Sequence, residues 1–172
     1  MNTNFLSPIG FTVNVKRLPN VEFYTQRMQI PGVSAGAAET PNPLSTLYNT
    51  PDKLLYQELD LSFIVDENMA NYFECLDWIE AITSPVELAQ FGRLEKTDDG
   101  IVSDISITIL NSNKNPNINF TFLNCFPVSL SQITLDVTPQ DVVYPEASMV
   151  FRYDRFTHTK IGWHSNKTVI EL

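Results

Sequence analysis

The segment from Leu55 to Val65 alternates apolar and polar side chains more regularly than any other part of this sequence. The apolar set is Leu55, Leu59, Leu61, Phe63 and Val65, and the polar set between them is Glu58, Asp60 and Ser62. Side chains of a β-strand point alternately to opposite faces, so this pattern predicts a half-buried strand of about a dozen residues. Such a strand makes a sheet the central element of the fold.

Shorter segments with the same period lie on both sides of it. Strands are expected at residues 11–15, 21–30, 105–109, 118–122, 128–137 and 147–156. Leu18-Pro19-Asn20 predicts a turn that joins the first two strands into a hairpin, and the polar cluster 111–117 predicts a second hairpin. Phe126-Pro127 predicts a bend, and a phase shift at Ser131-Gln132 indicates a bulge in the strand that follows.

Residues 68–82 show the period of an amphipathic helix instead. Apolar residues recur at steps of three and four, at Met69, Tyr72, Phe73, Leu76, Ile79 and Ile82. This spacing predicts a helix that lies on the sheet. The carboxylates and amide of Asp66-Glu67-Asn68 are expected to cap its start. A capping-box pattern at Ser84 predicts a short second helix to about Phe91.

Residues 33–52 are small, polar and rich in proline. Pro41, Pro43 and Pro51 each lack a backbone donor, so a central strand is not expected there. A segment of about 20 residues is long for a connection inside a compact domain. We therefore predict an extended loop or arm. Its apolar residues Leu44, Leu47 and Tyr48 lack a local core and are expected to lie at a contact between subunits.

The order of strands, one helix and further strands predicts an α+β fold dominated by β structure. We expect an antiparallel β-sandwich or incomplete barrel with one flanking α-helix and the extended arm. A length of 172 residues suits one domain. We assign residues 1–156 to this domain and residues 157–172 to a C-terminal extension.

The charge is distributed unevenly along the chain. The formal net charge is −9, from 20 acidic and 11 basic residues. Residues 58–104 hold twelve of the acids and two of the bases. The acidic balance argues against binding of nucleic acid through a broad basic surface. The acidic segment is either a solvated face that keeps the protein soluble or a surface that repels an anion or docks a basic partner.

The residues that usually carry enzyme chemistry are sparse. Cys75 and Cys125 have no histidine near them in the sequence, so packing of two reduced thiols is the simpler interpretation. His158 and His164 could share a metal ion only with further ligands, which the surrounding sequence does not supply. We therefore expect no catalytic residue, no metal and no cofactor, and we do not expect an enzyme. The chain also starts without a signal-peptide pattern and has no apolar run near the ~20 residues that span a bilayer, so we expect no membrane partner.

Two features instead favour an interface with other protein chains. Strands of an open sheet leave unpaired edges that a neighbour can complete, and the arm offers apolar groups. A closed ring of identical subunits satisfies both features, because a head-to-tail interface closes the edges around an axis. The alternatives are a monomer with a loop and a monomeric module that binds a peptide or glycan through Tyr48, Tyr56 and Trp163.

Several short motifs resemble the tail-tube proteins of contractile-tailed bacteriophages. They are Phe11-x-Val13-x-Val15, Ile30-Pro31-Gly32-Val33, the strand Leu55–Val65 running into Asp66-Glu67-Asn68, the helix ending near Trp78, and Phe126-Pro127-Val128 before a closing aromatic strand. The resemblance covers about residues 9–156, and the order and spacing of the motifs carry it more than any single motif.

The resemblance implies a virion structural protein, made in the host cytoplasm, whose six copies form a ring with one continuous barrel. It also implies that rings stack into a tube with a mostly acidic lumen, through which DNA passes without specific binding. The implied partners are further copies of the chain and other tail proteins: sheath, tube, baseplate or terminator. The acids that could face the lumen or a surrounding sheath are Glu58, Asp60, Glu74, Asp77 and Glu80.

The C-terminal extension departs from the plain tube pattern. It implies a specialised relative as the alternative, either a tail-completion or terminator ring that caps the tube or a baseplate ring that starts it. The same fold serves all of these positions, so the fold does not choose between them.

Overall fold

The computed structural model describes residues 5–85, 92, 100–138, 141 and 143–161. Its elements in chain order are β1 (Phe11–Val15), α1 (Pro19–Tyr24), β2 (Thr25–Gln29), β3 (Val33–Thr40), β4 (Leu47–Tyr56), β5 (Leu59–Ile64), α2 (Ala70–Thr83), β6 (Ser103–Leu110), β7 (Pro116–Leu130), β8 (Glu146–Arg152) and β9 (Arg155–Lys160). All strand pairs are antiparallel, and the main sheet does not close into a barrel. The predicted fold class, β-dominated α+β with a flanking helix and an arm, is confirmed.

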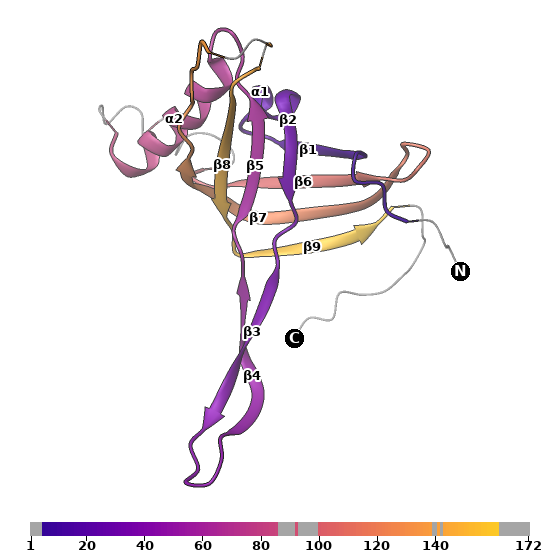
Figure 1. The fold of residues 1–172 in the computed structure, drawn as a ribbon, viewed down its shortest axis with the longest axis vertical. Helices are drawn as coiled ribbons and strands as arrows, with labels where there is room; N and C mark the ends of the chain where they lie inside the picture. The colour runs from indigo at the N-terminus through magenta and orange to yellow at the C-terminus, as the bar shows by residue number, and fades with distance from the viewer. Residues whose placement is uncertain (1–4, 86–91, 93–99, 139–140, 142, 162–172) are drawn as a thin grey trace.

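The seven strands of the main sheet form two layers that share β7. We call the strands β1, β6, β7 and β9 sheet A, and the strands β2, β5, β8 and the end of β7 sheet B. Figure 1 shows the strands of sheet B crossing those of sheet A at a steep angle, with the β3–β4 hairpin projecting from the body. Crossed layers of this kind enclose the core between them.

A corner in β7 joins the two layers. The first part of β7 pairs with β6, and its residues from Phe126 onward pair with β8. The corner residue Asn124 has a φ of 56°, a left-handed conformation that asparagine tolerates. Its backbone N–H donates to Asp104 Oδ1 at 3.0 Å, and its Nδ2 donates to Asp154 Oδ2 at 2.6 Å. The bend predicted at Phe126-Pro127 therefore lies just before that pair.

The strand predicted over residues 128–137 is wrong in its second half. β7 ends at Leu130, and residues 131–138 form no strand. Ser131 exchanges two hydrogen bonds of 2.8 Å with the backbone of Ser148, and the chain leaves the sheet there. The phase shift at Ser131-Gln132 marks the end of a strand rather than a bulge. Ile133 still packs against the core, but Leu135 and Val137 are largely or fully exposed, so their alternation does not reflect burial.

The core lies between the two sheets and α2. On β5 the alternating residues Leu59, Leu61 and Phe63 are fully buried, as their period predicts. Other large side chains of the same core are Val13, Val15, Trp78, Ile105, Ile107, Phe122, Met149 and Phe151. The predicted strand from Leu55 is divided at the base of the arm, because Leu55 belongs to β4 and β5 begins at Leu59.

α2 matches the predicted helix closely, but its start differs from the prediction. The N-cap residue is Met69, which has a left-handed φ of 54° and makes no side-chain cap. The side chain of Asn71, fully buried, stabilises the turn instead. Its Oδ1 accepts the N–H of Asp66 at 3.2 Å, and its Nδ2 donates to the carbonyl of Ile64 at 2.7 Å. The predicted capping by Asp66-Glu67-Asn68 is therefore wrong.

The stripe of α2 that enters the core consists of Asn71, Cys75, Trp78 and Ala81. The Trp78 ring lies 5.9 Å from the Phe151 ring, and Trp78 Nε1 donates to the carbonyl of Ile101 at 3.2 Å. Cys75 packs in the core, as predicted. Phe73 was expected on the buried side, but it is 49% exposed, because the apolar residues of this helix are spread over more than one face.

The hairpin predicted from residues 11–15 and 21–30 does not form. Pro19 begins α1, where a proline fits because the first helical residue needs no backbone donor. Val21 of α1 is fully buried, and β2 follows it as a strand of five residues. β1 and β2 lie at opposite ends of the strand order, since α1 carries the chain from sheet A to sheet B.

The predicted arm is present, and it is an antiparallel hairpin rather than a loop. β3 and β4 pair with each other and continue the β2–β5 ribbon away from the body (Figure 1). Pro41 and Pro43 lie in the turn of this hairpin. Pro51 lies where the register shifts, a position at which the ladder tolerates a missing donor.

The aromatic strand predicted at residues 147–156 is divided between the two layers. β8 belongs to sheet B and β9 to sheet A, and between them the N–H of Asp154 donates to the carbonyl of Leu123 at 3.1 Å. β9 continues to Lys160, past the domain end predicted at residue 156. Residues 86–91 of the predicted second helix lie outside the described residues.

Candidate functional site

The arm carries apolar side chains that its own subunit does not cover. Leu44, Leu47 and Tyr48 are 95%, 51% and 71% exposed. Leu54 and Leu55 on β4 are more than half exposed as well. The buried core and the side chains packed against it include no residue of β3 or β4 among those described. The predicted inter-subunit residues of the arm are therefore available for a contact with another chain.

The base of the arm is held firmly against the body. The Tyr56 ring lies 5.7 Å from the rings of both Tyr153 and Phe156. The Tyr153 hydroxyl donates to the carbonyl of Gln57 at 2.8 Å, and burial raises the pKa of Tyr153 to about 12, so this donor persists through neutral pH. Gly32 lies opposite, where a Cβ would approach Gln57 Oε1 to 2.8 Å. These contacts fix the direction in which the arm projects.

Tyr56 packs against other aromatic rings at the base of the arm. Of the residues considered for binding a glycan, Tyr48 lies on the exposed arm and Tyr56 lies in the aromatic cluster at its base. Trp163 lies outside the described residues. The structure does not bring these three aromatic side chains together into one described site.

The outermost strands are the second candidate surface. In the described structure β1 pairs with β6 alone, β9 pairs with β7 alone, and β2 pairs with β5 alone. Each strand thus presents one backbone edge that is not part of a ladder within the subunit. Edges of this kind pair readily with a strand of another chain.

The acids singled out in the sequence do not form one cluster. Glu58 Oε1 forms an ion pair with Arg152 Nη2 at 2.9 Å. Asp60 on β5 lies on the face of sheet B away from the core. On α2, Asp77 is exposed, while Glu74 is half-buried and accepts a hydrogen bond from Asn20. Glu80 is also half-buried on α2. These positions stay predictions for a lumen- or sheath-facing role.

Sequence reasoning missed the face of sheet A that points away from the core, here called the open face. The strand register aligns two rows of side chains across it. One row is Thr12, Thr108, Asn119 and Thr159, and the other is Asn14, Ser106, Thr121 and Thr157. Thr108 Oγ1 lies 3.3 Å from Asn119 Oδ1, and Asn119 Nδ2 lies 3.4 Å from Thr121 Oγ1. Six of these residues are polar members of predicted strands, whereas Thr157 and Thr159 lie in the predicted C-terminal extension.

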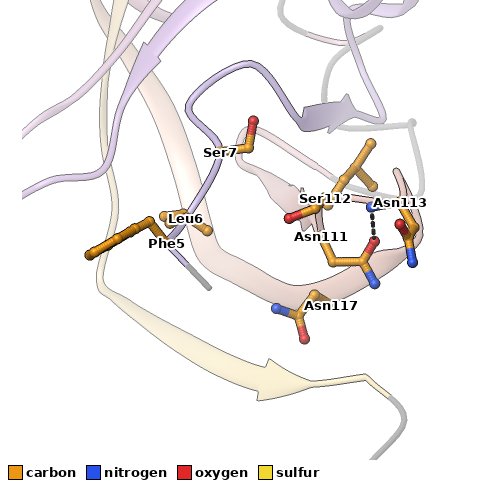
Figure 2. Close-up of a pocket in the computed structure, with 8 residues that line it drawn as sticks. Phe5, Leu6, Ser7, Asn111, Ser112, Asn113 and Asn117 are labelled. Carbon is orange, nitrogen blue, oxygen red and sulfur yellow. Dashed lines mark hydrogen bonds between the residues drawn. The ribbon is translucent and has the colours of Figure 1, made fainter. Parts of the chain in front are cut away.

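A shallow hollow lies between the N-terminal segment and the β6–β7 turn. Figure 2 shows Phe5, Leu6 and Ser7 on one side of the hollow and Asn111, Ser112 and Asn113 of the turn on the other. Asn111 Oδ1 accepts the backbone N–H groups of Asn113 and Asn115 at 2.9 Å and 3.0 Å. No titratable side chain lines this hollow, and the Asn111 carbonyl serves the turn itself, so the hollow offers no acid–base chemistry.

The two thiols are buried and unreactive in character. Burial is the main cause that raises the pKa of both Cys75 and Cys125 to about 12, so both remain protonated near neutral pH. Cys125 Sγ donates to the carbonyl of Phe122 at 3.4 Å. The His158 ring lies 6.4 Å from the Phe120 ring and is tilted by 41° to it, and His164 lies outside the described residues.

Across residues 5–85, 92, 100–138, 141 and 143–161, no three or more histidine, cysteine or acidic side chains gather in a way that could hold a metal ion. None of the helices in that part of the chain is long and apolar enough to cross a membrane.

Comparison with known proteins gives a consistent picture. A family model described as phage tail tube protein matches residues 3–159. A search of curated proteins finds no match to this sequence. Among solved structures, a chain of the anti-feeding prophage cap is 15% identical with a TM-score of 0.65, over 93% of this chain and 94% of that one. A chain of the anti-feeding prophage baseplate is 16% identical with a TM-score of 0.63, over 95% and 100% of the two chains.

A third structure has the same fold. A chain of the sheath–tube complex of an extracellular contractile injection system is 16% identical with a TM-score of 0.63, over 92% of this chain and 94% of that one. At identities this low, the structural likeness shows a shared fold and nothing more. The likeness extends over nearly the whole length of each protein.

Proposed function

Because this chain belongs to the phage tail tube protein family, we propose that its copies form hexameric rings that stack into a tail tube with a central channel for DNA. The chain is a structural component of a tail tube or tube-like assembly. Its place of function is the virion, and its partners are further copies of itself and other tail proteins. The anti-feeding prophage baseplate, in which a chain of the same fold occurs, is six-fold symmetrised, which supports the hexamer.

Sheet A supplies the observation that carries this proposal. Its four strands run in alternating directions, with β1 at one edge and β9 at the other. Because the number of strands is even, β9 of one copy can pair with β1 of the next copy in the same antiparallel sense. β1 has five residues and β9 has six, so the two edges match in length. Repetition of this contact around an axis joins the copies of sheet A into one barrel without a remaining edge.

The position of the core decides which face of that barrel lines the channel. Val13, Ile107 and Phe122 project from sheet A into the core, together with the side chains of sheet B and α2. The bulk of each subunit therefore lies on one side of sheet A. Six such subunits fit around a closed barrel only with this bulk outside, so the open face of sheet A points into the channel.

The arm is suited to contacts between rings. It projects from the body as a two-stranded ribbon whose base is fixed by Tyr56 and Tyr153. Its exposed leucines and tyrosine would be covered when the ribbon lies against a subunit of the adjacent ring. This arrangement buries apolar surface that the isolated subunit leaves in water.

A second candidate function is a ring at one end of the tube. Chains from a cap and from a baseplate have TM-scores of 0.65 and 0.63, equal within a few hundredths to the chain from a sheath–tube complex. A terminator or tube-initiating ring would use the same sheet edges, and one of its two stacking faces would meet a different protein.

Native mass spectrometry and negative-stain micrographs of the purified protein test the proposal. We expect oligomers in multiples of six and rings or tubes with a central hole. A tube subunit is expected to polymerise without limit, whereas an end ring is expected to stop at one or two rings. A species that stays monomeric at high concentration, with no rings in the micrographs, contradicts the proposal.

A further inference from the structure

The two rows on the open face of sheet A carry side chains of one chemical kind. The eight residues of its two rows, on β1, β6, β7 and β9, are five threonines, one serine and two asparagines, and none of the eight is charged. We propose that these two rows form the wall that a transported polymer meets, and that this wall is electrically neutral. The inference rests on the ring closure proposed above.

The described part of the acidic segment contributes little to this face. Of its eight acids among the described residues, Asp104 near the start of β6 projects on the open side of sheet A. On the neighbouring strand pair, Arg155 pairs with Leu123 and so lies on the same face, with the opposite charge. Asp104 Oδ1 is already used by the N–H of Asn124. The acids of α2 belong to a helix on the core side of sheet A, and Glu58 lies just before β5 of sheet B. The wall proposed here therefore differs from the acidic lumen that the resemblance implies.

A neutral wall has a definite physical consequence. Duplex DNA binds proteins chiefly through cationic side chains that release counterions, and this binding weakens steeply as salt rises. A wall of hydroxyl and amide groups neither attracts nor repels phosphates over a distance, and its groups are short and well hydrated. Passage along it is therefore insensitive to the charge of the polymer and to ionic strength.

Thiol labelling of assembled tubes tests the location of the wall. The native thiols are buried, so Thr121→Cys introduces one reactive site on the open face, and Asp77→Cys places a matched site on exposed α2. We expect a small biotin maleimide to label both variants in intact tubes. Streptavidin is expected to decorate Asp77→Cys tubes along their length and to bind the Thr121→Cys protein only after the tubes are dissociated. Decoration of intact Thr121→Cys tubes along their length overturns the inference.

DNA retention tests the neutrality of the wall. Tubes of the native protein and of Thr121→Gln are expected to retain no short duplex DNA at any salt concentration. Tubes of Thr121→Lys are expected to retain at least about tenfold more at about 50 mM salt and to lose it by about 200 mM, as counterion release requires. Salt-dependent retention or exclusion by native tubes overturns the inference. Absence of any tube in the micrographs is a failure of the proposed function itself, and the two failures are distinguishable for that reason.

Discussion

Replacement of residues 35–54 by an Asn-Gly turn is expected to leave a folded subunit whose rings no longer stack into tubes. Ser34 and Leu55 are paired across the hairpin, and a two-residue turn of this type joins such a pair without strain. The excised residues contribute nothing to the buried core among the described residues, so the melting temperature is expected to change by less than about 4 °C. Circular dichroism measures the fold, and sedimentation with electron microscopy measures assembly.

Point variants separate the apolar contact from the length of the arm. Leu47→Asp removes an exposed apolar group of the arm, and Ser45→Asp adds the same charge nearby while leaving the apolar groups in place. We expect Leu47→Asp to reduce stacking of rings into tubes by at least about tenfold, since a buried charge at an apolar contact is strongly unfavourable. Ser45→Asp is expected to assemble nearly as the native chain does. If excision of the arm unfolds the subunit, the arm belongs to its core and this interpretation of it fails.

Phe122→Ala is expected to lower the free energy of unfolding by about 3–5 kcal/mol, the range for loss of a buried phenylalanine. Phe122 is fully buried at the centre of sheet A. Its ring lies 5.0 Å from that of Tyr153 and 5.4 Å from that of Phe156, so it also holds β9 in the sheet. Because β9 supplies one edge of the proposed seam, ring formation is expected to weaken together with stability. Denaturant titration of the subunit measures the first effect.

Phe23→Ala is the matched control. Phe23 is 80% exposed and contacts the Tyr24 ring edge-on at 4.9 Å, so its loss is expected to change stability by less than about 1 kcal/mol. Equal losses for the two variants would mean that the core is not where the burial of Phe122 places it.

The sequence predicted best those elements whose local pattern and final burial agree. Leu59, Leu61 and Phe63 alternate in sequence and are buried in alternation, and Ile105 and Ile107 behave in the same way. A strand with one face on a core has this period because no other conformation sends every second side chain inward.

The errors arose where the pattern of a short segment fits more than one secondary structure. Pro19–Tyr24 forms one and a half turns of helix, too short for a helical period to stand out from an alternation of apolar residues. Tyr153-Asp154 divides a pattern that looks continuous, because the hydrogen bonds of Asp154 to the β7 corner redirect the chain. Corners of this kind depend on residues distant in sequence, which local periodicity does not report.

The candidate surfaces were predictable only in part. Leu44, Leu47 and Tyr48 stood out as apolar residues in a polar, proline-rich segment, and the structure leaves them exposed. The two rows on the open face could not be assembled from the sequence, because they join strands that are up to about 150 residues apart in a register that tertiary pairing sets.

Cysteine crosslinking across the proposed seam tests the central claim most directly. One cysteine is placed on β1, at Thr12 or Asn14, and one on β9, at Thr157 or Thr159, in four double variants; all four positions lie on the open face. If β9 of each copy pairs with β1 of the next, oxidation of at least one variant is expected to give a ladder of covalent oligomers that ends at a hexamer, while the single-cysteine variants give none. Assembled protein in which none of the four variants crosslinks beyond a dimer would contradict ring closure through these two strands.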